Sequence, residues 1–264
     1  MEKWEEKVEA IRRIKSEKRI KDSRLFEIVE EVFDYPTLMA LYHLIRTGVI
    51  RVVHGAVASG KEARIYWAEG AEGDLAVKIF LVVTAEFRRG RLKYIEGDPR
   101  FKRMGRRIRD MVRAWCSKEY RNLLRAYKAG VRVPKPYAYR ENVLVMEFIS
   151  GDERGRPAPL LKETSLSNPA RAFSVIKDYI ERLYRDADLV HADLSEYNIM
   201  VRDDELIIID WGSAVLVSHP HALEFLARDI RNIFHYFRRL GVDTGDPREF
   251  FRELTGEDPS LYFQ

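Results

Sequence analysis

The chain has 264 residues, 46% of them hydrophobic and 33% charged, and a formal net charge of +4. This length and hydrophobic content suit one folded domain, or two lobes that share a cleft. No apolar run approaches the roughly 20 residues needed to span a bilayer, and the charged N-terminus lacks a signal-peptide core, so we expect no membrane association and a cytoplasmic location. Cys116 is the only cysteine, which excludes an internal disulfide and suits a reducing compartment.

The first 48 residues predict a helical extension. Residues 1–24 alternate acidic and basic side chains and carry apolar residues at helical spacing, as expected of an amphipathic surface helix. A second helix is predicted over residues 23–34. A third is predicted from Pro36, a favoured first helical residue, to a stop at Gly48.

From residue 49 the periodicity becomes that of an antiparallel β-sheet. Extended runs over 49–57, 63–68 and 74–83 are separated by loops at 55–61 and 70–73. The first loop ends in Ser59-Gly60-Lys61-Glu62 and matches most of the Walker A pattern. Glu62, however, replaces the hydroxyl that the pattern requires, and a strand follows where a helix should begin. We therefore interpret the loop as a hairpin that covers phosphates with its backbone amides, Ser59 and Lys61.

A single lysine interrupts an apolar strand. Lys78 lies in Ala76-Val77-Lys78-Ile79-Phe80, and a buried ammonium needs a partner because leaving it unpaired is costly. Glu119 falls within the inward stripe of a predicted helix over 110–129, so we predict that it pairs with Lys78. The rest of that stripe consists of Met111, Val112, Trp115, Leu123, Ala126 and Tyr127. The arrangement resembles the strand lysine of protein kinases, which holds the α and β phosphates of ATP and pairs with a helix glutamate.

The following strand ends in a predicted hinge. An apolar run over 142–149 breaks into Ser150-Gly151-Asp152, which indicates a connection between two lobes. The simplest interpretation is a connection and nothing more. As a nucleotide-binding hinge, it presents the backbone of Glu147 and Ile149 to the edge of an adenine ring, with Met146 as a further candidate for nucleotide binding.

The second half combines helices with a cluster of polar residues. Helices are predicted after the cap Ser167-Asn168-Pro169, over 223–240 and over 247–254. Between them the loop 191–198 carries Asp193 and Asn198, and the strand 205–210 ends at Asp210. Phosphoryl transfer needs a carboxylate at the attacking oxygen and oxygen ligands for magnesium. We assign the first role to Asp193 and the metal to Asn198 and Asp210, while Lys78 holds the phosphates.

These residues follow the order found in protein kinases: strand lysine, helix glutamate, H-x-D-x-x-x-x-N and D-x-G. Over roughly residues 49–240 the chain resembles the RIO-type atypical protein kinases, and within them the RIO kinase one subfamily in its archaeal form. The resemblance is carried by segments 59–63, 93–101, 146–149, 189–198, 209–210 and 219–226. It implies an ATP-dependent serine/threonine kinase or ATPase that uses Mg²⁺, or Mn²⁺ in its place, and acts in maturation of the small ribosomal subunit. It also implies that Asp210 can become transiently phosphorylated.

We therefore predict an α+β fold of the bilobal protein-kinase type, with an antiparallel sheet in the N-lobe and a helical, truncated C-lobe. The expected divisions are a helical extension over 1–48, an N-lobe over 49–149 that includes a basic insert at 84–110, and a C-lobe over 150–264. Ala192 replaces the Arg of the usual H-R-D motif. No A-P-E segment occurs in the 54 residues after Asp210. We expect weak activity on free peptides and regulation by a partner.

The segment 84–113 is the most basic part of the chain, with eleven Arg or Lys and four acidic residues. A solvated insert is one interpretation. The other is that the segment binds ribosomal RNA, because seven excess positive charges with interleaved Phe87, Tyr94 and Phe101 suit a nucleic-acid partner. Tyr94 carries the only side-chain hydroxyl between Ala85 and Cys116, so serine autophosphorylation is excluded there.

Three other readings stay open. An aminoglycoside- or choline-kinase-like enzyme has a similar catalytic loop but generally needs a larger helical substrate lobe. The small kinase of the KEOPS tRNA-modification complex is a relative that is normally shorter at the N-terminus and the insert. A nucleotide-switched RNA-binding scaffold would use ATP turnover only for release. The protein substrate cannot be read from the sequence.

Overall fold

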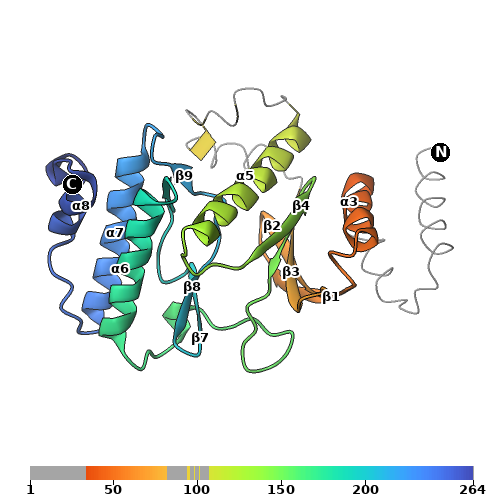
Figure 1. Ribbon diagram of the computed structural model, residues 1–264, viewed down its shortest axis with the longest axis horizontal. Coiled ribbons are helices and arrows are strands. Elements are labelled where there is room, and N and C mark those ends of the chain that lie inside the picture. Colours follow the sequence, from red (N-terminus) through yellow and green to blue (C-terminus); the bar gives the residue numbers. More distant parts are fainter. Residues whose placement is uncertain (1–33, 82–93, 96–97, 99–100, 102–106, 264) are drawn as a thin grey trace.

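The computed structural model describes residues 34–81, 94, 95, 98, 101 and 107–263. The helices predicted over 1–24 and 23–34 lie outside these residues, as does most of the segment 84–113. The described part divides into a half built on a β-sheet and a mainly helical half (Figure 1). This is the predicted α+β arrangement.

Five antiparallel strands form the sheet, in the order β1-β2-β3-β5-β4. They are β1 (Val52–Ser59), β2 (Ala63–Glu69), β3 (Asp74–Phe80), β4 (Pro136–Arg140) and β5 (Val143–Glu147). The predicted antiparallel pairing of the first three strands is confirmed. The first turn is shorter than predicted, because β1 continues through Gly55 to Ser59 with register shifts between Val53 and Ala58.

Two helices cover opposite faces of this sheet. Helix α3 (Tyr35–Arg46) packs Ala40, Leu41 and Leu44 on the face that includes Val77 and Ile79, and α5 (Ile108–Lys128) packs on the other face. Successive strand residues point to opposite faces, so Lys78 turns toward α5 between two residues that turn toward α3.

The stripe predicted for the helix over 110–129 is correct except at its last member. Tyr127 is 44% exposed, whereas Ala126 and the other predicted members are buried. The predicted third helix of the extension is confirmed as α3, which has Pro36 in its first turn and is followed by Gly48 at a φ of 80°.

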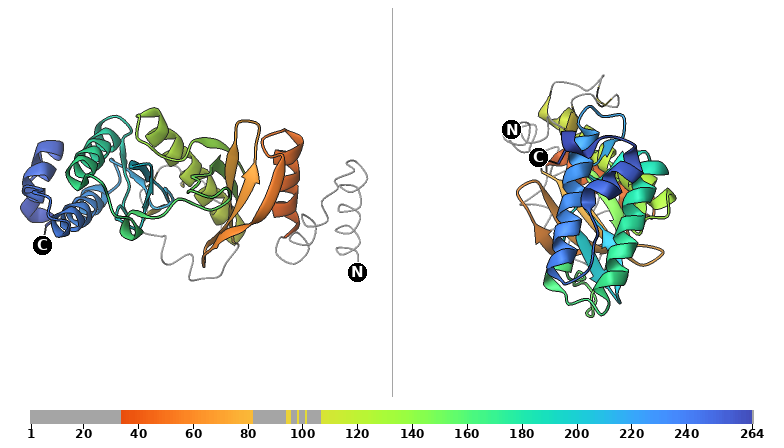
Figure 2. Two further views of the ribbon diagram at one scale, coloured as in Figure 1. Left: turned by 90° about the horizontal axis from the view of Figure 1, so that it is seen from below. Right: turned by 90° about the vertical axis from the view of Figure 1, so that its left-hand side faces the viewer.

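The helical half contains α6 (Pro169–Arg185), α7 (Ala222–Arg239), α8 (Pro247–Thr255) and the 3-10 turns η2 (Leu161–Glu163) and η3 (Pro259–Leu261). Helices α6 and α7 lie side by side (Figures 1 and 2), and the rings of Phe173 and Phe234 meet at 5.0 Å. The three helices predicted for this half are confirmed, and Asn168 caps α6 as expected.

Two short antiparallel strand pairs lie between the helices of the second half and the sheet. One is the hairpin of β7 (Ile199–Arg202) and β8 (Glu205–Ile208), and the other pairs β6 (Leu189–Val190) with β9 (Val215–Leu216). Because loop 191–198 joins β6 to β7, and Asp210 follows β8, the two strand pairs bring the predicted catalytic loop beside Asp210. Among the described residues, no helix is both long enough and apolar enough to cross a membrane.

Candidate active site

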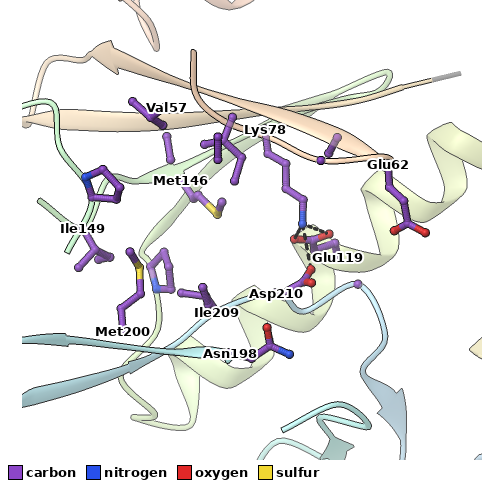
Figure 3. A pocket seen from close by; sticks show the side chains of 18 of the residues that line it. Val57, Glu62, Lys78, Glu119, Met146, Ile149, Asn198, Met200, Ile209 and Asp210 are labelled. Atoms are coloured by element: carbon purple, nitrogen blue, oxygen red, sulfur yellow. Dashed lines mark hydrogen bonds and ion pairs between the residues drawn. The ribbon is translucent and has the colours of Figure 1, made fainter. Parts of the chain in front are cut away.

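A cleft of about 950 Å³ lies between the sheet and the helical half. Its wall comes from the β1–β2 hairpin, β3, α5, β5, the loop before η2 and the segment around Asp210 (Figure 3). This volume and position are typical of a small-molecule site. The predicted site residues that line it are Ser59, Gly60, Lys61, Glu62, Lys78, Glu119, Met146, Glu147, Ile149, Asn198 and Asp210.

At the centre of the cleft, one ammonium contacts two carboxylates. Lys78 Nζ lies 2.7 and 3.0 Å from the two oxygens of Glu119 and 3.0 Å from Asp210 Oδ1 (Figure 3). The predicted pairing of Lys78 with Glu119 is therefore confirmed; the contact with Asp210 was not predicted. Burial alone would lower the pKa of Lys78, but Asp210 and Glu119 together raise it, so Lys78 is positively charged. The Glu119 side chain is 2% exposed and that of Asp210 is 54% exposed.

Asp193 is not among the residues that line the cleft, but it contacts Asn198, which is. The Asn198 side-chain amide donates to the Asp193 backbone carbonyl at 2.8 Å and to Asp193 Oδ2 at 3.2 Å. The Asn198 backbone carbonyl in turn accepts from the Ile209 amide at 3.0 Å. These bonds connect the loop that carries Asp193 and Asn198 to the backbone immediately before Asp210.

Two residues of these connected segments have a left-handed backbone conformation, which non-glycine residues rarely adopt. Their φ angles are 65° at Ala192 and 62° at Asp210. His191 Nε2 lies 3.1 Å from the Ile209 carbonyl, so Nε2 carries the proton that this bond needs. Burial lowers the pKa of His191, against the opposite effect of this bond, and the imidazole is neutral. The loop 191–198 is thereby joined to Ile209, the residue preceding Asp210.

Asp229 on α7 fixes the same loop from the other side, and sequence analysis missed it. Its two carboxyl oxygens accept from the Ala192 amide at 2.7 Å and from the Leu194 amide at 2.9 Å. The Arg228 side chain donates to the Ala192 carbonyl. The available signal was a carboxylate within the apolar stripe of α7, the same kind of signal that identified Glu119.

The pair of Asn198 and Asp210 suits a magnesium ion better than a structural metal. Within the described part of the chain, no three His, Cys, Asp or Glu residues cluster as a metal site. Magnesium usually takes one or two protein oxygens and completes its shell with water and substrate phosphates. A half-exposed carboxylate beside an amide oxygen fits that requirement.

The wall of the cleft next to β5 is apolar. Met146, Ile149, Met200 and Ile209 point into the cleft (Figure 3). Met200 was not predicted, and neither was the lining by residues 157–160 and Glu163. An apolar residue that lines a cavity has the same sequence signature as a core residue, so no sequence signal marked them.

The side chain of Glu147 has a structural role. Both carboxylate oxygens accept from Arg132 at 2.8 Å, and one also accepts from the Lys135 amide at 3.0 Å. Burial would raise the pKa of Glu147, but Arg132 and the Lys135 amide lower it. The Glu147 backbone amide donates to the Lys135 carbonyl. The Glu147 amide is therefore used within the protein, and the contact of this backbone with adenine stays a prediction.

The two aromatic residues of the basic segment that the structure describes are in the core. Tyr94 and Phe101 are each 8% exposed, and Tyr94 packs 5.3 Å from Phe225 and 6.4 Å from Trp115. The prediction that these two rings are available to RNA bases is wrong, because tertiary contacts cover them. Phe87 lies outside the described residues.

The sheet with its helix-paired lysine, set against a loop carrying Asp193 and Asn198, defines a fold of the protein-kinase class. Two crystal structures of the Rio2 kinase from Chaetomium thermophilum share the fold. One is its ADP/Mg²⁺-phosphoaspartate complex, with a TM-score of 0.65 and 22% identity, covering 85% of this chain and 67% of that chain. The other has a TM-score of 0.66 and 24% identity, covering 85% and 69%.

The chain belongs to the RIO kinase family, since the RIO domain model matches residues 64–250. It is 46% identical over 242 residues to the RIO-type serine/threonine-protein kinase Rio1 of Haloferax volcanii, covering 91% of this chain and 81% of the relative. Identity to Rio1 of Methanocaldococcus jannaschii is 42% over 228 residues, covering 86% and 77%. The Caenorhabditis elegans kinase RIO1 is 40% identical, and the chain spans 48% of its length. The family resemblance, its subfamily and the serine/threonine kinase class are thus confirmed.

Proposed function

We propose that this kinase transfers the γ-phosphoryl group of ATP in the cleft described above, with magnesium as the cofactor. The observation that carries the proposal is the contact of Lys78 with both Glu119 and Asp210, opposite Asn198. This arrangement places a fixed positive charge and two oxygen ligands for a metal ion at one end of an apolar cleft. The complex of the related Rio2 kinase with ADP and Mg²⁺ supports the choice of nucleotide and metal.

Each residue has a distinct role in the proposal. The apolar wall holds adenine, the backbone at Glu147 and Ile149 meets its edge, and Lys78 holds the α and β phosphates. The hairpin residues Ser59 to Glu62 cover the phosphates. Asn198 and Asp210 would hold magnesium, which when bound would neutralise charge on the transferring group.

Asp193 acts on the acceptor. Its exposed carboxylate orients the attacking hydroxyl and accepts its proton, a contribution worth about 10²- to 10⁴-fold in rate. The Asn198 amide, which donates to Asp193, holds that carboxylate in place.

Asp210 is also a proposed phosphate acceptor. Its half-exposed carboxylate faces the cleft, and the Rio2 structure was described as a phosphoaspartate complex. In this step a carboxylate oxygen forms a bond to the γ-phosphorus, the bond to the β-phosphate oxygen breaks, and ADP leaves. Water then releases inorganic phosphate and restores the carboxylate.

The proposed setting is maturation of the small ribosomal subunit in the cytoplasm. The excess of seven positive charges over 84–113 supports ribosomal RNA as the partner of that segment. The lone cysteine supports a reducing compartment.

Labelling with γ-labelled ATP tests the proposal. The chain is incubated with purified small-subunit precursors, and protein-bound label is then treated with acid or with hydroxylamine. Label that resists both treatments is phosphoserine or phosphothreonine, and label released by hydroxylamine is phosphoaspartate. Either label supports phosphoryl transfer in this cleft, and the role of Asp210 as an acceptor requires the label that hydroxylamine releases. RNA-stimulated release of inorganic phosphate without any protein-bound label would favour the scaffold alternative, and rapid transfer to free small metabolites would favour a small-molecule kinase.

A further inference from the structure

Helix α5 contacts the segment after Asp210 through two polar side chains one helical turn apart. Lys118 Nζ donates to the Gly212 carbonyl at 2.8 Å. The Asn122 amide donates to the carbonyls of Trp211 at 3.1 Å and Ala214 at 2.8 Å. Three backbone carbonyls within four residues are therefore bound by one face of one helix.

Both side chains are buried at positions that apolar residues usually occupy. Lys118 is 1% exposed and Asn122 is fully buried. The Lys118 ammonium also lies 4.8 Å from the Trp115 ring, a distance at which the ring face attracts a cation. Burying an ammonium and an amide is costly unless they are hydrogen-bonded, so these contacts define where the segment docks on α5.

The segment they hold begins with a strained residue. Asp210 has a φ of 62°, a conformation that persists only where surrounding contacts enforce it. Two residues later, Gly212 packs directly on α5. A Cβ atom there would lie 2.9 Å from Trp115 Nε1 and 3.1 Å from Glu119 Oε2.

We propose that Lys118 and Asn122 are positioning residues that keep residues 210–214 docked on α5 and thereby hold the Asp210 carboxylate at its place beside Lys78. Because Glu119 is on the same helix, the Lys78–Glu119 pair and Asp210 then move together. The inference rests on the proposed role of Asp210 as a magnesium ligand, and it assigns the control of that ligand to α5.

Magnesium titrations of Lys118→Met and Asn122→Leu test this inference. The measured quantities are the Mg²⁺ concentration for half-maximal ATP turnover, nucleotide affinity in EDTA and the melting temperature. We expect the Mg²⁺ requirement to rise about 10- to 100-fold, the usual effect of removing a group that orients a metal ligand, while affinity in EDTA stays unchanged. Cys116→Ala is the matched control. It removes a fully buried thiol from the same helix, and should lower the melting temperature without changing the Mg²⁺ requirement.

A second route avoids the buried polar groups in case their variants do not fold. Gly212→Ala leaves Lys118 and Asn122 intact but inserts a methyl group between the segment and α5, and should raise the Mg²⁺ requirement in the same way. A lower melting temperature with the wild-type Mg²⁺ requirement in all folded variants overturns the inference. Asp210→Asn separates this from the proposed function. If Asp210→Asn keeps the wild-type Mg²⁺ requirement, the metal assignment fails. If Asp210→Asn raises the Mg²⁺ requirement and the α5 and Gly212 variants do not, the assignment stands and the role of α5 fails.

Discussion

Lys78 shows how one side chain connects the two halves of the molecule. Its ammonium extends from β3 to Glu119 on α5 and to Asp210 beyond β8. Glu119 is almost fully buried, whereas Asp210 is half exposed to the cleft. The first contact is thus mainly structural, and the second leaves a carboxylate surface for a ligand.

We expect Lys78→Met to destabilise the fold in a pH-dependent way. The change removes the ammonium that the buried Glu119 contacts, and breaking a buried ion pair costs about 3–5 kcal/mol. Without the ammonium, protonation of the buried carboxylate in the variant offsets part of the cost. The loss in free energy of unfolding should therefore be smaller at pH 5 than at pH 8. Urea unfolding at both pH values measures it. Adding Glu119→Gln should recover part of the loss, and an equal loss at both pH values would contradict the account.

Asp229 gives a second pH prediction. Burial raises its pKa to about 8, although its two backbone amide donors act in the opposite direction. The folded state then binds a proton that the unfolded state releases above about pH 4, so stability from this group falls as pH rises from 4 to 8. The slope is at most about 1.4 kcal/mol per pH unit. The free energy of unfolding of wild type, relative to that of Asp229→Asn, should fall as the pH rises from 5 to 8. A difference that stays constant over this range would rule out this titration.

At the level of elements, α3 is fixed to the sheet by a buried polar contact. The Thr37 hydroxyl donates to Asp34 at 2.7 Å and accepts from the Asn142 amide at 2.9 Å. Asn142 also donates to the Phe80 carbonyl at the end of β3. Arg109, in the first turn of α5, pairs with Asp34. Residues 34–37 therefore join α3, the sheet and α5.

Thr37→Val keeps nearly the same side-chain shape but leaves the buried Asn142 amide without its hydroxyl partner. It should therefore lower the free energy of unfolding by about 1–3 kcal/mol. Thr37→Ser is the matched control, since it keeps the hydroxyl. Chemical denaturation of both variants is the measurement. Equal losses for valine and serine would mean that the methyl group, and not the hydrogen bonds, fixes α3.

Sequence periodicity predicted most elements because their apolar residues repeat at helical or strand spacing. It found Glu119 because a carboxylate interrupted an apolar stripe. Lys118 and Asn122 gave a similar signal, but their partners are backbone carbonyls, which carry no sequence mark. The extent of β1 was underestimated because Gly55 suggests a turn, while strand pairing and bulges decide where the strand ends.

At the level of the whole molecule, burial depends on contacts that no local pattern reveals. Tyr94 and Phe101 looked like nucleic-acid contacts in a basic segment, yet Tyr94 packs against Phe225 of α7. The cleft could be predicted because its polar residues follow a known order. Its apolar wall could not, since Met200 becomes a cavity residue only when the two halves meet.

RNA binding should depend on charge and not on Tyr94. If about six cations of the segment 84–113 contact phosphates, log affinity should fall against log salt with a slope of about −4 to −5. Neutralising Arg88, Arg89, Lys102, Arg103, Arg106 and Arg107 should weaken binding and flatten that slope. Tyr94→Phe keeps the buried ring and should change neither quantity. Filter binding over a salt series measures both, and unchanged affinity and slope after neutralisation would refute the assignment.

The most direct test of the catalytic assignment is ATP turnover by Asp193→Ala, measured together with its nucleotide affinity. Asp193 is exposed and reaches the cleft through Asn198, so its removal should leave the nucleotide site intact. We predict that turnover falls about 10²- to 10⁴-fold while affinity for ATP stays at the wild-type value. Near-native turnover by this variant would contradict the account.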